Sequence, residues 1–174
     1  AFHWPFEFPE VFEQGGFSAF VGNPPFIGGQ KISTVLGEFY FKYLRQEYQS
    51  ATGTADLCSL FFLRSYFQLL KGGVLGLIAT NTIAQGDTRV GGLEYIINNG
   101  GTIFYASSST PWPGVAAVHV CVVHFYRGKY SGRKLLDGTV VNFISPFLDN
   151  SESESSPIRL AGNKNKSFIG SYVL

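Results

Sequence analysis

The chain has 174 residues, of which 45% are hydrophobic and 14% charged, with a formal net charge of +1. This balance excludes a largely disordered chain, and no apolar run reaches the roughly 18 residues of a membrane-spanning helix. A domain that relied on phosphate contacts for its affinity would be more basic. The sequence contains no methionine and does not begin like a signal peptide, so we expect a cytoplasmic segment of a longer protein. We also expect Cys58 and Cys121 to be buried free thiols.

Residues 2–12 are rich in aromatic side chains and contain two prolines, which predicts an irregular, packed approach, with 10–12 as a short strand or turn. The apolar residues 17–22 then predict a short buried strand that ends at Asn23-Pro24-Pro25-Phe26. Neither proline can donate a hydrogen bond, so no ladder or helix continues through them. Ligands of open α/β sheets bind at such carboxyl ends of strands. Gly28 and Gly29 allow close backbone approach or a flexible lid.

Two helical patterns follow. The apolar residues between 36 and 48 recur at helical spacing and predict an amphipathic helix. The next helix, almost entirely apolar and therefore expected to be mostly buried, begins near Thr54 or Asp56, either of which suits an N-cap. It is predicted to stop at Lys71-Gly72-Gly73. Residues 74–80 form a near-continuous apolar run, typical of a parallel strand covered on both faces.

The order strand, helix, strand predicts a βαβ unit, with the loops 23–29 and 81–89 on the same rim of one sheet. A short helix over 90–99 and strands at 102–107 and 115–126 complete the unit. The glycine pairs 72–73, 91–92 and 100–101 are interpreted as helix caps or turns. Beyond Tyr126 a strand is predicted at 139–145, followed by a polar linker at 151–156.

The four residues Asn23-Pro24-Pro25-Phe26 carry a specific chemistry, although such a motif can also be a simple turn. The Asn23 side-chain oxygen and the Pro24 carbonyl can both accept hydrogen bonds from an exocyclic amine on a planar ring, while Phe26 stacks on that ring. Two acceptors on one amine draw its nitrogen towards tetrahedral geometry and expose the lone pair. That lone pair attacks an electrophilic methyl group.

This motif and its surroundings resemble the amino-group DNA methyltransferases that modify adenine with S-adenosylmethionine. Phe-His-Trp-Pro-Phe-Glu-Phe-Pro-Glu-Val-Phe, leading into Phe-Val-Gly-Asn-Pro-Pro-Phe-Ile-Gly-Gly-Gln, is similar to the large single-chain enzymes of bacterial restriction–modification and phage-defence systems. Further similar segments are Asp56-Leu57, Lys71-Gly72-Gly73, Thr80-Asn81-Thr82-Ile83-Ala84-Gln85-Gly86 and Trp112-Pro113-Gly114. The resemblance covers most of residues 1–130 and includes the tail.

The resemblance implies an α/β fold: the C-terminal half of a Rossmann-like, S-adenosylmethionine-dependent methyltransferase domain, with a mostly parallel sheet and a terminal antiparallel hairpin. Residues 1–130 would be the half that carries the target-base pocket, and 131–174 a linker and the start of a following target-recognition region. The implied partner is double-stranded DNA, bound through the full-length protein, with the adenine flipped into the pocket. No membrane association is expected.

The resemblance also implies roles for individual residues. Asn23, Pro24, Pro25 and Phe26 would be catalytic, with Asn23 and Pro24 on the amine and Phe26 on the ring. Trp112 would cover the other face of the ring or be a packed structural residue. Asn81 and Gln85 would line the rim, whereas Asp87 or Arg89 could cap the next helix.

The cofactor site departs from the family pattern. The family needs a glycine-rich loop after an earlier strand, and no Gly-x-Gly precedes Asn23. We therefore expect an incomplete site for S-adenosylmethionine, and the missing N-terminal half of the same domain as a partner. The segment alone is expected neither to bind the cofactor well nor to turn over.

Other functions stay open at this point. Methyltransferases that act on protein glutamine or RNA guanine also hold an amine on Asn-Pro-Pro. A non-catalytic DNA-binding or assembly fragment would use the basic residues Arg127, Lys129 and Arg133. No metal site is expected, because His119 and His124 face opposite sides of one strand and His119 with Cys121 supplies two ligands, too few for zinc.

Overall fold

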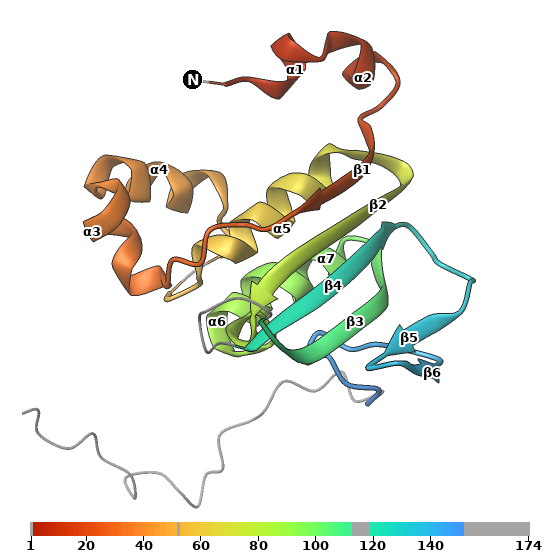
Figure 1. Cartoon of the computed structure of the whole chain (residues 1–174). Helices are drawn as coiled ribbons and strands as arrows, with labels where there is room; N and C mark the ends of the chain where they lie inside the picture. Colours follow the sequence, from red (N-terminus) through yellow and green to blue (C-terminus); the bar gives the residue numbers. More distant parts are fainter. Residues whose placement is uncertain (1, 52, 113–118, 152–174) are drawn as a thin grey trace, which may run out of the picture.

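The computed structural model describes residues 2–51, 53–112 and 119–151, which form one sheet and the helices around it (Figure 1). The strands are β1 (Phe17–Gly22), β2 (Leu69–Thr80), β3 (Gly101–Pro111), β4 (His119–Arg127), β5 (Lys134–Leu136) and β6 (Thr139–Val141). The α-helices are α1 (Trp4–Glu7), α2 (Pro9–Glu13), α3 (Ile32–Leu36), α4 (Glu38–Glu47), α5 (Leu57–Gln68), α6 (Gly86–Arg89) and α7 (Tyr95–Asn98). Two 3₁₀ turns, η1 (Gly29–Lys31) and η2 (Asn81–Ala84), and a π-helical turn, η3 (Val90–Glu94), complete the elements.

The six strands lie in the order β1-β2-β4-β3-β5-β6. The pairs β1–β2 and β3–β5 are parallel, and β4 is antiparallel to both of its neighbours, β2 and β3. Strands β1, β2, β3 and β5 therefore run the same way, and β4 and β6 run against them. This arrangement confirms the predicted α/β class, with a mostly one-directional sheet and an antiparallel hairpin, β3–β4.

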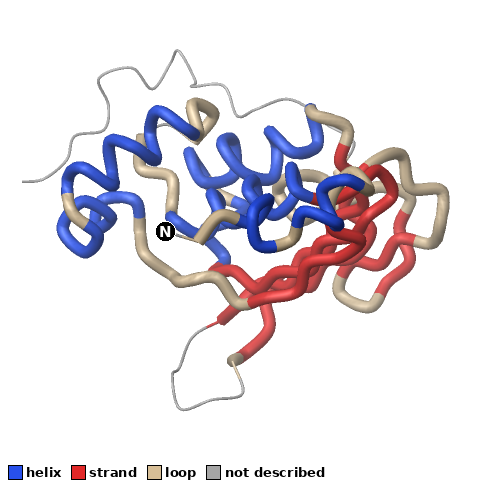
Figure 2. Tube along the Cα trace, turned by 90° about the horizontal axis from the view of Figure 1, so that it is seen from above, coloured by secondary structure: helices blue, strands red, loops and turns tan. Residues whose placement is uncertain are grey.

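The core lies between the sheet and α5. Seven of the 12 residues of α5 are buried, and Phe62 packs edge-on against Phe125 of β4, with ring centroids 6.4 Å apart. The strands turn alternate residues towards this helix: Leu75, Leu77 and Ala79 of β2 are buried while their neighbours are not. In Figure 2 the helices lie on one side of the sheet. The second face of β2 is half-buried rather than covered, which differs from the prediction for residues 74–80.

Helix α5 ends at Gln68, three residues before the predicted stop at Lys71-Gly72-Gly73. Leu69 already pairs with Phe17 of β1, and the register then shifts, so that Ala19 pairs with Val74. Gly72 has a φ of +82°, which glycine adopts at low cost. Lys71-Gly72-Gly73 therefore lies inside β2 and accommodates the shift in register. The helix ends before Leu69 because Leu69 pairs with β1 instead of continuing the helix.

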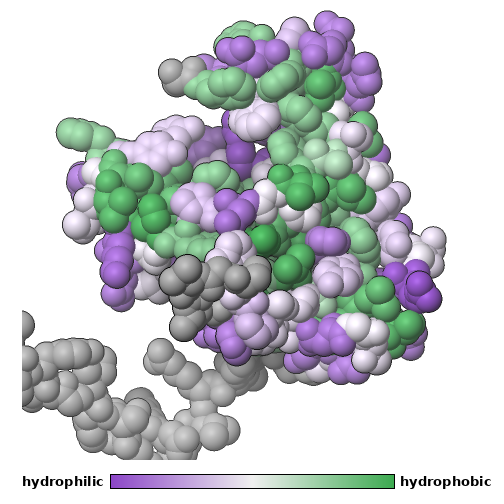
Figure 3. Space-filling model, viewed as in Figure 1, coloured by the Kyte–Doolittle hydropathy of each residue, from purple (hydrophilic) through white to green (hydrophobic). Residues whose placement is uncertain are grey.

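The predicted helix over 36–48 is α4, which spans Glu38–Glu47 and is separated from the preceding α3 by Gly37, with a φ of +88°. Its apolar stripe is also not buried as a whole: the exposed fraction is 91% for Phe39, and Tyr40 and Tyr43 are exposed as well. In α4, which is described over its whole length, Leu44 is the buried side chain. Apolar side chains accordingly gather over α3 and α4 on the left of the space-filling view (Figure 3).

The predicted helix over 90–99 is correct in place but irregular, because it is a continuous run of α6, η3 and α7. The prediction of a helix cap or turn at Gly91 and Gly92 is wrong, because both lie inside the π-helical turn. A Cβ at Gly91 would lie 2.6 Å from the Cα of Ala51, and one at Gly92 would lie 3.0 Å from the Cβ of Ser59. These glycines therefore permit close packing of η3 on its neighbours. Gly100, with a φ of +86°, follows α7 in a turn, as predicted.

The aromatic N-terminal segment contains two short helices where an irregular approach was predicted. Each helix has a proline in its first turn, where the missing N–H has no helical partner to lose. Trp4 packs edge-on against Phe17 and Phe20 of β1, with ring centroids 5.4 and 5.8 Å away. Aromatic packing thus attaches this segment to the first strand.

The C-terminal part of the description extends the sheet. Strand β5 pairs with β3, and the predicted strand over 139–145 is shorter, ending at Val141. Residues 113–118, the Ser/Glu linker from 152 and the tail lie outside the described residues. Cys58 and Cys121 are buried and free, as predicted; burial raises the pKa of Cys58 to about 12 and that of Cys121 to about 11. None of the helices described is long and apolar enough to cross a membrane.

Candidate functional site

One rim of the sheet collects the predicted site residues. Because β1 and β2 are parallel neighbours, the loops after Gly22 and Thr80 both begin at the carboxyl ends of the strands, on one rim of the sheet, as predicted. Val120 of β4 pairs with both Thr80 and Thr110, so the end of β3 lies at this edge too. Trp112 therefore shares the rim with Asn81, and the intervening strand β4 sets their strands about 10 Å apart.

The Asn23–Phe26 loop combines a buried anchor with accessible functional groups. Pro24 is buried, whereas Asn23 and Pro25 are exposed. The Phe26 ring is 42% exposed, large for an aromatic side chain. The buried proline ring fixes the backbone, and the Asn23 amide and the Phe26 ring stay accessible to a ligand from the rim.

The residues that follow Phe26 attach the loop to the start of α5. The Leu57 N–H donates to the Ile27 carbonyl at 2.9 Å, and the Gly29 N–H donates to the Asp56 Oδ1 at 3.1 Å. A Cβ at Gly29 would lie 2.3 Å from the Thr54 carbonyl oxygen, so only glycine permits this approach. Of the two predictions for the glycine pair, close backbone approach is the one that the structure shows, and it applies to Gly29.

Asp56 joins the two loops of the rim, a role that sequence reasoning missed. It occupies the N-cap position of α5 but makes no side-chain cap bond. Its Oδ1 accepts from Gly29, and its Oδ2 accepts from the Thr82 hydroxyl at 2.6 Å. We call these two hydrogen bonds the Asp56 clasp. An aspartate before a helix is interpreted first as a cap, and the residues next to Asp56 carry no separate signal for this use.

A cavity of about 500 Å³ opens beside the loop. Its wall includes Phe26, Lys31, Val35, Thr54 and Asp56. Phe26, two residues after Pro24 in the chain, therefore forms part of the wall of this cavity. The volume is within the range of small-molecule and cofactor sites.

In the loop after β2, two of the predicted residues are exposed at the rim, and two others have structural roles. Asn81 and Gln85 are exposed, and the buried Ile83 anchors the turn between them. Asp87 accepts hydrogen bonds from the N–H of Thr54, at 2.8 Å, and from its hydroxyl, at 3.2 Å. Asp87 thus fixes the segment before α5, which is a structural role.

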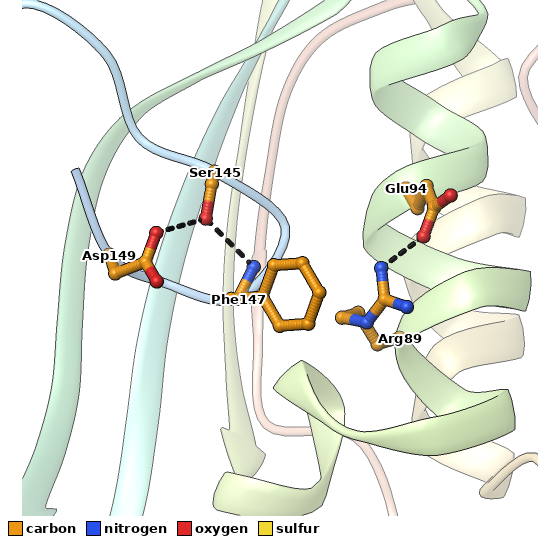
Figure 4. A network of polar contacts seen from close by, with 5 residues as sticks. All are labelled: Arg89, Glu94, Ser145, Phe147 and Asp149. Atoms are coloured by element: carbon orange, nitrogen blue, oxygen red, sulfur yellow. Dashed lines mark hydrogen bonds and ion pairs between the residues drawn. The ribbon is translucent and has the colours of Figure 1, made fainter. Parts of the chain in front are cut away.

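Arg89 is buried away from the rim, with 5% of its surface exposed. It forms an ion pair with Glu94, and its guanidinium lies over the Phe147 ring, 4.0 Å from the centroid (Figure 4). The Ser145 hydroxyl, which donates to Asp149 at 2.5 Å and accepts from the Phe147 N–H at 3.1 Å, shapes the loop that carries this ring. Arg89 therefore ties the segment after β6 to the helices.

Trp112 is half-buried at the end of β3, and its neighbours Pro113 and Gly114 lie outside the described residues. The two histidines of β4 are separated, as predicted from their spacing. His119 is exposed at the rim, 3.0 Å from the Ser109 hydroxyl, whereas His124 lies on the second face beside Tyr105. The Cys121 thiol donates to the Ser108 carbonyl. Within residues 2–112 and 119–151, Thr52 excepted, no three His, Cys, Asp or Glu side chains are grouped to hold a metal ion.

The glycine pairs do not form a cofactor loop in the described part of the chain. The space beside Gly73 is filled by the carbonyls of Phe17 and Ser18, and the space beside Gly91 by the backbone of Ser50 and Ala51. No open strand-to-helix turn is left at these positions for a cofactor.

Comparisons with known proteins place this architecture. A solved structure of the type IIL restriction-modification enzyme MmeI in complex with DNA is similar, with a TM-score of 0.61 and 20% sequence identity over 84% of this chain. The match spans only 21% of the MmeI chain, and at this identity it shows the fold. Among curated protein sequences, none matches.

The family model described as Eco57I restriction-modification methylase matches residues 1–103. This match covers the Asn23–Phe26 loop, both strands of the βαβ unit and the whole Asp56 clasp. It extends over more than half of the chain. The chain belongs to the Eco57I restriction-modification methylase family.

Proposed function

We propose that this chain carries the target-base pocket of a DNA adenine-N6 methyltransferase, in a restriction–modification or phage-defence system of the cytoplasm. The observation that supports this most is the loop itself: Pro24 is buried at a strand end while Asn23 and the Phe26 ring remain accessible. The family membership supports a methylase. The DNA partner and the reaction belong to the whole protein, of which the chain is a part in this proposal.

The residues of the loop act on the amine of the target base. The Asn23 Oδ1 and the Pro24 carbonyl each accept one amine hydrogen, which directs the nitrogen lone pair out of the ring plane. After alkylation the nitrogen carries one extra proton, and these acceptors hold it until it passes to water. S-adenosylmethionine, when bound, would supply the electrophilic methyl group, with its sulfonium becoming a neutral thioether as the methyl carbon–sulfur bond breaks. The acceptors therefore work by geometry and hydrogen bonding, without a covalent link to the base.

Stacking offsets part of the cost of flipping. Extruding a base costs a few kcal/mol, and stacking on an aromatic ring returns about 1–3 kcal/mol per base. Phe26 supplies one such ring, and in this proposal Trp112 approaches the other face from the end of β3. Asn81 and Gln85 line the rim between them. Residues 1–130 are the part that carries the pocket, and 131–174 lead to a following region.

The direct test is the loss of base methylation on substitution of Asn23. In a polypeptide that contains this chain and methylates plasmid DNA, Asn23→Ala should lower the yield of N6-methyladenine by about 10²-fold or more, the effect of losing a positioned hydrogen-bond acceptor in the transition state. Mass spectrometry of digested nucleosides measures it. Asn142→Ala is the matched control, because Asn142 is exposed and lies outside the rim. Unchanged N6-methyladenine in Asn23→Ala would overturn the proposal.

The substrate class is tested in the same preparation by following a radiolabelled methyl group. Label in DNA, on adenine, supports the proposal. Label in protein or RNA instead would reassign the amine to a glutamine side chain or a guanine and overturn the adenine assignment.

A non-catalytic DNA-binding role would depend on the basic turn at 127–133. This turn lies at the ends of the strands opposite to the rim. Arg127 pairs with Gly101 at the start of β3, and its guanidinium donates to the carbonyls of Leu69 and Phe67. Reversing the charges of Lys129 and Arg133, which are both exposed, should therefore leave base methylation intact. Loss of the biological effect in this variant, with Asn23→Ala unaffected, would favour the binding role.

A further inference from the structure

We infer that Asp56 is the positioning residue that sets the separation of the two loops of the rim, and so the place of the target amine. This inference rests on the proposed function. Asp56 touches neither base nor donor in this role; it acts through Gly29 and Thr82. It goes beyond the loop residues themselves because it names what holds them.

The geometry of the carboxylate makes the connection direct. One oxygen receives the Gly29 N–H at 3.1 Å, three residues after Phe26, and the other receives the Thr82 hydroxyl at 2.6 Å, one residue after Asn81. A planar, rigid group thus links a loop that follows β1 to a loop that follows β2. Hydrogen bonds to a charged acceptor are shorter and about twice as strong as neutral ones.

Asp56 is itself held in place, which a positioning residue requires. Its N–H donates to the Thr88 hydroxyl at 3.1 Å, and its carbonyl accepts from the N–H and the hydroxyl of Ser59. The Thr82 hydroxyl is also 2.6 Å from that of Thr80, at the end of β2. The clasp is therefore fixed by the start of α5, by α6 and by the sheet.

The backbone leaves little freedom for the loop to compensate. Gly29 lies against the carbonyls of Thr54 and Ala55, where even a Cβ would not fit, and the Leu57 N–H holds Ile27. Loss of the clasp would release the loop on the side of Gly29 and let Phe26 shift. A misplacement of about 1 Å costs about 10²-fold in rate.

The first arm of the test measures the clasp in the 174-residue chain and does not depend on any activity. Native-state hydrogen exchange of the Gly29 amide is compared in the wild type, Asp56→Ala and the milder Asp56→Asn, with the Leu77 amide of β2 as the global reference. We expect protection of Gly29 to fall by about 10-fold or more in Asp56→Ala, a local opening, while Leu77 is unchanged. Ser50→Ala is the matched control, because its hydroxyl donates to the Gly91 carbonyl and bonds no residue of the clasp.

The second arm measures turnover in the polypeptide that methylates DNA. Asp56→Ala and Thr82→Val should lower kcat while the KM for DNA stays within about 3-fold, because the interaction lost acts on geometry at the reacting centre and not on uniform binding. The double variant should be no slower than Asp56→Ala, since both changes cut the same link. Ser50→Ala should keep wild-type kcat.

Each outcome has a separate meaning. Unchanged Gly29 exchange in Asp56→Ala, or equal loss of protection at Leu77, overturns the clasp. A clasp that opens with kcat unaffected overturns the positioning role. If the wild type does not methylate DNA, the proposed function fails, and the exchange arm still decides whether Asp56 joins the loops.

Discussion

The two faces of the sheet are made of similar residues but are packed differently. On the first face, Leu75 and Leu77 of β2 and Phe125 of β4 are almost fully buried beneath α5. On the second face, Val74 is 36% exposed and Val21 of β1 is 90% exposed. Figure 1 looks onto this second face, with α5 behind the strands, and none of the helices described lies across it.

This difference shows that an apolar run indicates which strand residues are able to be buried. It does not indicate whether another element covers them. Residues 74–80 are a near-continuous apolar run, and only their alternate members are buried. On the second face the half-buried ring of His124 lies beside Tyr105 and Phe104, with centroids 4.7 and 5.6 Å away. Side chains of the sheet thus shelter one another there, with no helix above them in the described part of the chain.

The largest expected effect comes from the first face. Phe62→Ala removes a fully buried ring from α5 and should lower the free energy of unfolding by about 3–5 kcal/mol. Urea unfolding measures it. An effect below about 1 kcal/mol would mean that the first face is not the core, and the comparison of the faces would fail.

A pair of glycine substitutions sharpens the comparison. Gly101→Ala places a Cβ 2.6 Å from the Ile96 side chain and 3.0 Å from its carbonyl, beneath α7, and should cost about 1–3 kcal/mol by overpacking. Gly76→Ala on the second face meets the His124 ring at 3.0 Å. Because that ring is half-buried it can move, and the cost should be smaller. Thermal unfolding of both variants checks the order, and a larger cost for Gly76→Ala contradicts it.

His124 makes the stability of the second face depend on pH. Burial lowers the pKa of His124 from its ordinary 6.5. As pH falls through 6.5, the unfolded chain binds a proton before the folded one does, so the stabilisation is complete above pH 6.5 and is lost towards the lower folded-state pKa. His124→Phe should flatten this part of the curve of unfolding free energy against pH. Identical curves for the two proteins would show that the ring titrates alike in both states.

The smallest effect is expected at the edge of the second face. Val21→Thr keeps the β-branched shape of a side chain that is 90% exposed, so the free energy of unfolding should change by no more than about 0.5 kcal/mol. Chemical denaturation is the measurement. A loss comparable with that of Gly101→Ala would show that the second face is covered in solution.

The sequence predicted the fold where local pattern and tertiary packing agree. The strand before Asn23, the buried helix after Asp56 and the shared rim of the two loops follow from periodicity and from the βαβ order. The errors arise where distant contacts decide. Leu69 left the helix because it pairs with Phe17. On α4, Leu44 is buried, whereas Phe39, Tyr40 and Tyr43 of the stripe are exposed.

The candidate site shows the same limit. The Asn23–Phe26 loop can be predicted from four consecutive residues, because the prolines that shape it and the strand that precedes it are adjacent in the sequence. The role of Asp56 cannot be predicted in this way, because its partners Gly29 and Thr82 are 27 and 26 residues away in the sequence. A helix N-cap explained that aspartate adequately from its neighbours alone. Arg89, read as a possible cap, is likewise paired with a loop that begins more than 50 residues later in the chain.

The two long-range hydrogen bonds of Asp56 also determine when the rim can form. During synthesis the Asn23–Phe26 loop emerges early, but the Thr82 hydroxyl that completes the clasp emerges only after α5 and β2. Closing contacts between distant residues carries an entropic cost that local contacts do not. The loop should therefore take its final geometry late in folding, after β1 and β2 have paired, and a nascent chain that stops short of η2 would contain the motif without its arrangement.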